Sequence, residues 1–146
     1  MAGEIACAIL AGATISANAK PAITTFDPPG SIEVLPPLSI NASGAIVGSY
    51  GDQDDNPRGF IRNPDGSFTD FDPDGSVATD MYGTDSINDS GVITGSYRDD
   101  SFVLHGFIRS ADGTIISFDP AGSTETVAMA VNKRGVITGW YLDSNS

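Results

Sequence analysis

The sequence contains one cysteine and one histidine, and this scarcity limits its chemistry. Cys7 has no partner for an intrachain disulfide, and no cysteine-based metal site can form. Because Cys7 lies in an apolar stretch, residues 5–10, it is interpreted as a packed core residue rather than a reactive thiol. With His105 as the single imidazole, a zinc site made of several histidines is excluded by number.

Basic residues and long apolar runs are also scarce. The 146 residues carry 19 acidic and 7 basic side chains, which give a net charge of -12. Such a surface repels phosphate backbones and attracts cations, so nucleic acid is not expected as a partner. No apolar run approaches the roughly 18 residues of a spanning helix, so membrane insertion is not expected either. The sequence also lacks a Gly-x-Ser-x-Gly nucleophile motif and a glycine-rich phosphate loop.

Glycine and proline, by contrast, are abundant, with 17 and 9 copies. Many turns between short strands account for both numbers. No segment keeps the apolar period of about 3.6 residues that a helix requires, so helix is at most a minor component. The sequence therefore predicts a single all-β domain over residues 1–146.

Three motifs recur in a fixed order along the chain. They are Phe-Asp-Pro-x-Gly-Ser, then (Ile/Val)-Asn-x-x-Gly-x-Ile-x-Gly-x-Tyr, then Gly-Phe-Ile-Arg. A constant order at a spacing of about 45 residues indicates tandem copies of one structural unit. The copies begin at Phe26, Phe71 and Phe118 for the first motif, at Ile40, Ile87 and Val131 for the second, and at Gly59 and Gly106 for the third.

Each copy is predicted to form four short strands. In the first full copy they are expected at residues 38–40, 45–50, 59–62 and 67–72. Asp65-Gly66 lies between the last two, and an Asp-Gly pair supplies the positive φ that a hairpin turn needs. Four strands in about 45 residues is typical of a β-propeller blade. The predicted fold is β-propeller-like with about three units, namely residues 31–75, residues 76–122 and the partial units 1–30 and 123–146.

The repeat resembles the HAF repeats of bacterial extracellular proteins. Those repeats combine Ile-Asn-x-x-Gly-x-Ile-x-Gly-x-Tyr with His-(Ala/Gly)-Phe and Phe-Asp-x-Pro-Gly. Here His105-Gly106-Phe107 matches the naming triplet, whereas the preceding copy has Arg58-Gly59-Phe60. The resemblance covers about residues 22–141. It implies a secreted or surface-associated, propeller-like protein in an extracellular or periplasmic location, and it implies no defined reaction.

About three units are fewer than the four or more blades that usually close a propeller ring. An unclosed set leaves open sheet edges, which proteins avoid. We therefore expect self-association, either as a dimer that completes a six-bladed ring or as another closed oligomer.

Residues 1–19 allow two interpretations. A modest apolar run and the small residues at 17–19 are typical of a cleaved secretion signal, whereas Glu4 and the absence of Lys or Arg before the run are not. The alternative, which we favour, is a structural strand.

Residues that recur in every copy are expected to have structural roles. Asp72 and its equivalents are predicted to accept hydrogen bonds from backbone N–H groups at their turn, and the repeated asparagines are predicted to do the same. The repeated tyrosines are predicted to pack between units. These sets are Asp27, Asp72 and Asp119; Asn41, Asn88 and Asn132; and Tyr50, Tyr97 and Tyr141.

The second copy departs from the others in an acidic motif. Asp70, Asp72 and Asp74 alternate before a glycine, and Asp80 follows close by. Alternate carboxylates followed by glycine are typical of a calcium loop, so these four residues are the candidate ligands for Ca²⁺ as a cofactor. The alternative is an acidic surface turn, and Pro73 argues against an EF-hand. A second acidic loop, residues 52–56, is interpreted as solvated.

Three functional hypotheses remain open. The first is a secreted, non-catalytic module that binds a glycan, another small molecule, a peptide or a partner protein; Tyr82 and Trp140 are its candidate exposed aromatics. The second is a calcium-dependent hydrolase of lactone or ester bonds, in which Ca²⁺ polarises the carbonyl and Asp72 or His105 activates water. The third is a structural fragment of a longer repeat protein.

His105 is the residue on which the catalytic hypothesis depends most. Because it stands at a repeated position, a packing or hydrogen-bonding role is the simpler interpretation. A Ser-His-Asp arrangement with Asp99 or Asp100 is the alternative. An enzyme of the proposed kind requires Asp70, Asp72, Asp74 and His105 in or near one pocket.

Overall fold

The computed structural model describes residues 7–10 and 23–144. These residues form twelve strands and no helix, so the prediction of an all-β chain is confirmed. The strands are β1 (Cys7–Leu10), β2 (Ile23–Phe26), β3 (Glu33–Ile40), β4 (Ile46–Gly51), β5 (Pro57–Arg62), β6 (Phe68–Phe71), β7 (Ala78–Asp80), β8 (Ile93–Arg98), β9 (Leu104–Arg109), β10 (Ile115–Phe118), β11 (Ser123–Val131) and β12 (Ile137–Asp143).

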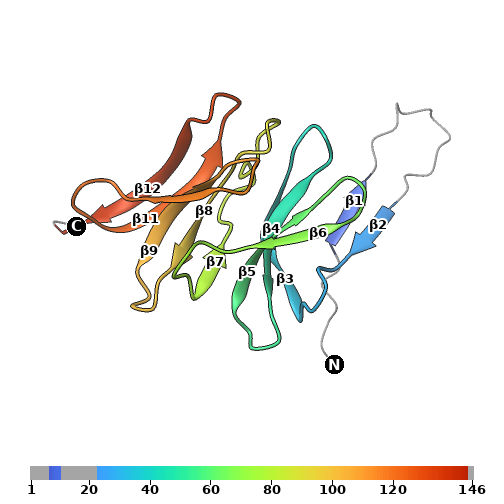
Figure 1. Cartoon of the computed structure of the whole chain (residues 1–146), viewed down its shortest axis with the longest axis horizontal. Helices are drawn as coiled ribbons and strands as arrows, with labels where there is room; N and C mark the ends of the chain where they lie inside the picture. Colours follow the sequence, from blue (N-terminus) through green and yellow to red (C-terminus); the bar gives the residue numbers. More distant parts are fainter. Residues whose placement is uncertain (1–6, 11–22, 145–146) are drawn as a thin grey trace.

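The strands form four antiparallel sheets in which each strand pairs with its neighbour in sequence. Two sheets have four strands, β3-β4-β5-β6 and β7-β8-β9-β10, and two have two strands, β1-β2 and β11-β12. The sheets follow one another along the longest axis of the molecule, with β1-β2 at one end and β11-β12 at the other (Figure 1). The described residues therefore do not close into a ring, and the propeller remains a prediction.

The hairpin turns form where the repeated glycines predict them. Gly66 has φ of 89° and Gly113, its equivalent, has φ of 95°, a region that residues with a Cβ rarely adopt. In the first of these turns, the Gly66 amide donates to the Asn63 carbonyl at 2.9 Å. The Asp65 carboxylate accepts a bond from the Ser67 amide at 2.9 Å, which fixes the tip of the turn.

Apolar side chains fill the spaces between successive sheets. Val47 and Phe107 are fully buried between the two four-stranded sheets. Gly95 in β8 makes room for the Phe107 ring, because a Cβ at this position would lie 2.8 Å from the ring. On the opposite face of the first four-stranded sheet, Phe60 packs against Phe26 of β2 with ring centroids 6.4 Å apart. Sheet packing therefore repeats from one pair of sheets to the next.

Residues 1–19 are only partly described. Cys7–Leu10 form β1, which pairs with β2, whereas the expected cleavage region at residues 17–19 lies outside the described residues. Within the described part of the chain, no helix has the length and apolar character needed to cross a membrane.

Candidate functional site

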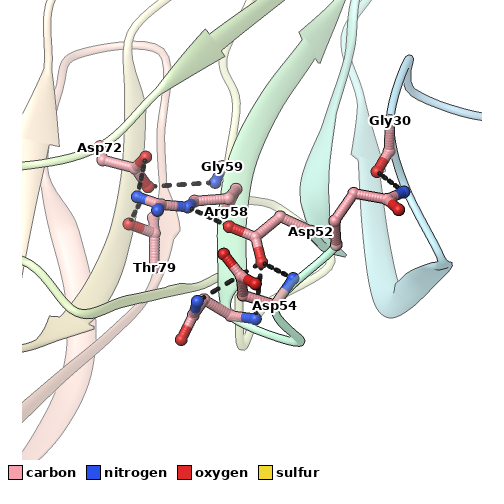
Figure 2. A network of polar contacts seen from close by, with 9 residues as sticks. Gly30, Asp52, Asp54, Arg58, Gly59, Asp72 and Thr79 are labelled. Atoms are coloured by element: carbon pink, nitrogen blue, oxygen red, sulfur yellow. Dashed lines mark hydrogen bonds and ion pairs between the residues drawn. The ribbon is translucent and has the colours of Figure 1, made fainter.

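In the first four-stranded sheet, the guanidinium of Arg58 lies between two carboxylates. Arg58 on β5 donates from Nε to Asp52 Oδ2 at 3.0 Å and from Nη1 to Asp72 Oδ2 at 3.1 Å (Figure 2). Asp52 lies in the loop before β5, and Asp72 directly follows β6. The loop interpreted as solvated thus contributes one structural carboxylate, which bonds to its own loop amides as well, at Asp54 and Asn56.

The second four-stranded sheet repeats this arrangement with histidine in place of arginine. His105 Nδ1 lies 2.7 Å from Asp119 Oδ2, and His105 Nε2 lies 3.4 Å from Asp99 Oδ2. The ring stacks on Tyr97 with centroids 5.2 Å apart. The predicted neighbour Asp99 is therefore a partner of His105, and the two ring nitrogens both face carboxylates.

Burial and hydrogen bonding oppose each other at this histidine. Burial lowers the pKa of His105, but the hydrogen bonds that its ring makes to the Asp119 and Asp99 carboxylates outweigh burial and leave the pKa above its ordinary value. Backbone bonding from Val103, together with His105, holds the pKa of the Asp99 carboxyl below its usual range. The two carboxylates thus stabilise the protonated, charged form of His105 relative to the neutral ring.

Asp72 joins two sheets rather than closing its own turn. Its Oδ1 accepts a bond from the Thr79 hydroxyl of β7 at 2.5 Å, and the Gly59 amide lies 3.5 Å away. The turn itself is closed by the backbone, since the Ser76 amide donates to the Pro73 carbonyl. The expectation that Asp72 bonds the amides of its turn was therefore wrong, because a charged guanidinium and a buried hydroxyl lie within its reach.

The four candidate calcium ligands do not gather at one point. Asp70 is exposed on β6, and Asp80 faces the Tyr82 hydroxyl at 3.1 Å and Arg98 at 3.9 Å. No group of three acidic, histidine or cysteine side chains placed to hold a metal occurs among the described residues. Asp72 and Asp74 do share a pocket of about 380 Å³ with residues of β10, but neither Asp70, Asp80 nor His105 lines it.

The repeated asparagines form a ladder from sheet to sheet. Each accepts backbone N–H bonds within its own turn, as predicted; Asn88 Oδ1 does so from Ser90 and Val92 at 3.0 Å. In addition, Asn41 Nδ2 donates to the Asn88 carbonyl at 3.1 Å, and Asn88 Nδ2 donates to the Asn132 carbonyl at 3.0 Å. The turn bonds follow from the local motif, whereas the ladder depends on how the sheets stack.

A pocket of about 540 Å³ lies along this ladder. Exposed Ile40 and Val136 give it apolar walls, and both side chains are more than half exposed, at 56% and 58%. Asp89 also lines the pocket, but its carboxylate already has partners: it accepts a hydrogen bond from the Ala42 amide at 2.9 Å and lies 3.6 Å from Lys133 Nζ.

Asp85 is an acidic residue of this pocket whose carboxylate is available to a ligand. Its backbone carbonyl accepts the Val131 amide at 3.0 Å, but its exposed carboxylate makes no hydrogen bond or ion pair within residues 7–10 and 23–144. Sequence reasoning noted Asp85 only as an acidic residue near the candidate calcium loop and did not predict its place in this pocket, because it belongs to no repeated motif. Its departure from the other copies, at a position next to a repeated asparagine turn, was the available signal.

The two aromatics proposed for binding are both exposed, at 36% for Tyr82 and 46% for Trp140. Trp140 lies on β12 beside a smaller groove of about 190 Å³ that Phe118 also lines. Comparison of the chain with models of protein families, with curated proteins and with solved structures gave no match.

Proposed function

We propose that the chain is a non-catalytic, propeller-type binding module that acts outside the cell, and that its ligand is a glycan. The observation that carries the proposal is the pocket of about 540 Å³ at the asparagine ladder. It combines one uncommitted carboxylate, Asp85, with exposed aliphatic side chains. A carboxylate accepts bonds from sugar hydroxyls, and aliphatic walls cover the apolar C–H faces of a sugar ring.

The charge of the chain supports a neutral or cationic ligand. At a net charge of -12, an anionic ligand is repelled before it reaches the pocket. Lys133 does not offset this, because it is paired with Asp89. Neutral oligosaccharides are not repelled by this charge, and they offer both hydroxyl groups and apolar C–H faces. The resemblance to HAF repeats, which remains a prediction, agrees with an extracellular setting.

A calcium-dependent hydrolase is the second candidate, and one observation favours it. Asp72, Asp74 and Ser117 line the pocket of about 380 Å³. Two observations weigh against it: Arg58 and Thr79 already engage both Asp72 oxygens, and His105 is held between carboxylates outside this pocket. The binding module therefore remains the better supported function.

The test is a titration with neutral oligosaccharides of cello-, xylo- and chito- type, followed by two-dimensional NMR. Binding should shift the amides of the asparagine turns and should weaken by about tenfold or more in Asp85→Ala, which removes a charged acceptor. Asp54→Ala is the matched control, because it removes one exposed carboxylate outside the pocket. Equal shifts in both variants, or shifts confined to other strands, would contradict the proposal; binding of short peptides alone would replace glycan by peptide.

A further inference from the structure

The two-stranded sheets at the ends of the molecule are complementary halves of one four-stranded sheet. In the complete sheets, Phe71 pairs with Gly59 and Phe118 pairs with Gly106, across the fourth and third strands. Phe26 pairs with Cys7 in the same register, so β1 and β2 occupy the third and fourth positions. The strands β11 and β12 occupy the first and second positions, because their turn carries the same Asn-x-x-Gly motif as the turns before β4 and β8.

The strand β12 has the sequence of an interior strand but the exposure of an edge strand. Its Ile-Thr-Gly-x-Tyr segment matches that of β8. Tyr50 and Tyr97, on β4 and β8, are 6% and 8% exposed, whereas Tyr141 on β12 is 51% exposed. Within the described residues, β12 pairs with β11 alone. An exposed apolar edge of this kind is a template for another strand.

A second observation locates the strand that would cover this edge. Phe26 and Phe71 are each buried against a phenylalanine on the third strand of the next sheet, Phe60 and Phe107, at 6.4 and 6.0 Å. Phe118 is their equivalent in the second four-stranded sheet, and it is only half-buried beside the groove of about 190 Å³. By analogy, Phe118 would be covered by the third strand of the next sheet, which would lie beside β12.

A third observation concerns the bonds between sheets. Ser49 accepts the Met81 amide at 3.0 Å, and Ser96 accepts the Ala128 amide at 3.0 Å. At the next joint the serine position is occupied by Trp140. On β3, the position that corresponds to the donors Met81 and Ala128 is occupied by Pro36, which has no N–H. Donor and acceptor are thus replaced together by two apolar groups that suit each other, although they belong to different sheets: Trp140 lies on β12 in the two-stranded sheet at one end of the molecule, and Pro36 lies on β3 in the first four-stranded sheet (Figure 1).

We infer that two copies of this chain join head to tail, with β12 of one copy pairing antiparallel with β1 of the other. The register of the complete sheets then sets Trp140 opposite Cys7 of the second copy. Trp140 packs on Pro36 of the second copy, and the asparagine ladder continues from Asn132 to the carbonyl of Asn41 of the second copy. This interface does not depend on the ligand proposed above.

The number of sheets fixes the size of the closed assembly. The described residues of each copy contribute two complete sheets and two halves, which is three sheets in all. The interface is head to tail, so it closes only as a ring. Rings of about four to eight blades are those that propellers form, and the multiple of three in that range is six. The assembly is therefore a dimer.

Sedimentation equilibrium on residues 1–146 tests the assembly, and a disulfide tests the register. The expected mass is twice the 15.1 kDa of one chain. In Trp140→Cys, oxidation should link two copies through Cys7, because directly opposed Cα atoms lie about 4.5–5.5 Å apart, within disulfide range. Leu142→Cys is the control: it lies two residues along the same strand, about 7–8 Å diagonally from Cys7, and should link poorly.

Three results would overturn the inference. They are a monomer at all concentrations, a dimer in which both cysteine variants link equally, and a dimer in which Trp140→Cys links only within one chain. Hydrogen exchange of the unmodified protein gives an independent readout if a variant misfolds. The β12 amides should exchange slowly in the dimer, and fast exchange in a dimer would also contradict the inference.

Discussion

His105 and Asp119 stand 2.7 Å apart in the second four-stranded sheet, at the positions that Arg58 and Asp72 occupy, 3.1 Å apart, in the first. One sheet therefore holds a permanent cation between its two carboxylates, and the other holds a titratable one. The same architecture is thus insensitive to pH in one sheet and sensitive in the other.

This difference predicts how stability depends on pH. The pKa of His105 is raised on folding, so its contribution is fully present below the ordinary value of about 6.5 and is lost as pH rises through the higher folded value. We expect the free energy of unfolding, measured by urea denaturation, to fall as pH rises above about 6.5, the ordinary pKa of histidine. His105→Arg should flatten this slope, and Arg58→His should add a second one. An unchanged slope in His105→Arg would show that another group titrates.

The asparagine ladder predicts a different effect from two similar substitutions. Asn88→Asp keeps the turn acceptors but removes the Nδ2 donor to Asn132 and sets a carboxylate near that carbonyl, at a buried site. We expect a loss of about 1–3 kcal/mol in the free energy of unfolding. Asn132→Asp is the control, since its Nδ2 has no partner within the described part of one chain. Both are compared by denaturant titration at concentrations where the chain is monomeric, and equal losses would argue against the ladder.

The arrangement around Asp72 predicts the outcome of calcium titration. Because Arg58 and Thr79 engage its oxygens, Asp72 has to break two bonds before it can ligate a metal. In a calcium titration of chelator-stripped protein by calorimetry, we therefore expect no saturable heat of binding that is lost in the double variant Asp70→Ala/Asp74→Ala. Micromolar to millimolar binding that the double variant loses would instead establish the loop as a calcium site, and would justify assays with esters and lactones.

Local motifs predicted the local structure well. The Asp65-Gly66 turn, the turn bonds of Asn88 and the strands that follow them depend on neighbouring residues, and such patterns are visible in one sequence. The strand β3 extends further than expected, over Glu33–Ile40, although two prolines lie within it. A register shift between Leu35 and Ser39 accommodates these prolines.

The contacts between sheets were not predictable in the same way. Asp72 recurs at a fixed place in the motif, but its bond to Thr79 arises only when the next sheet stacks on it. The same is true of Asp85, which reaches the pocket through the stacking of three turns. Repetition indicates that a residue has a structural role, whereas stacking determines which partner it meets.

The central claim is that the repeat continues from one copy of the chain into the next through Trp140 and Pro36. The most direct measurement is the dimer dissociation constant, by sedimentation, of Trp140→Ser, Pro36→Ala and the double variant. Trp140→Ser should weaken the dimer by about tenfold or more, because it removes a buried aromatic. The double variant should recover much of this loss, because it restores the serine-to-amide bond that Ser49 and Met81 make. Independent, additive effects of the two substitutions, or none on the dimer, would contradict the claim.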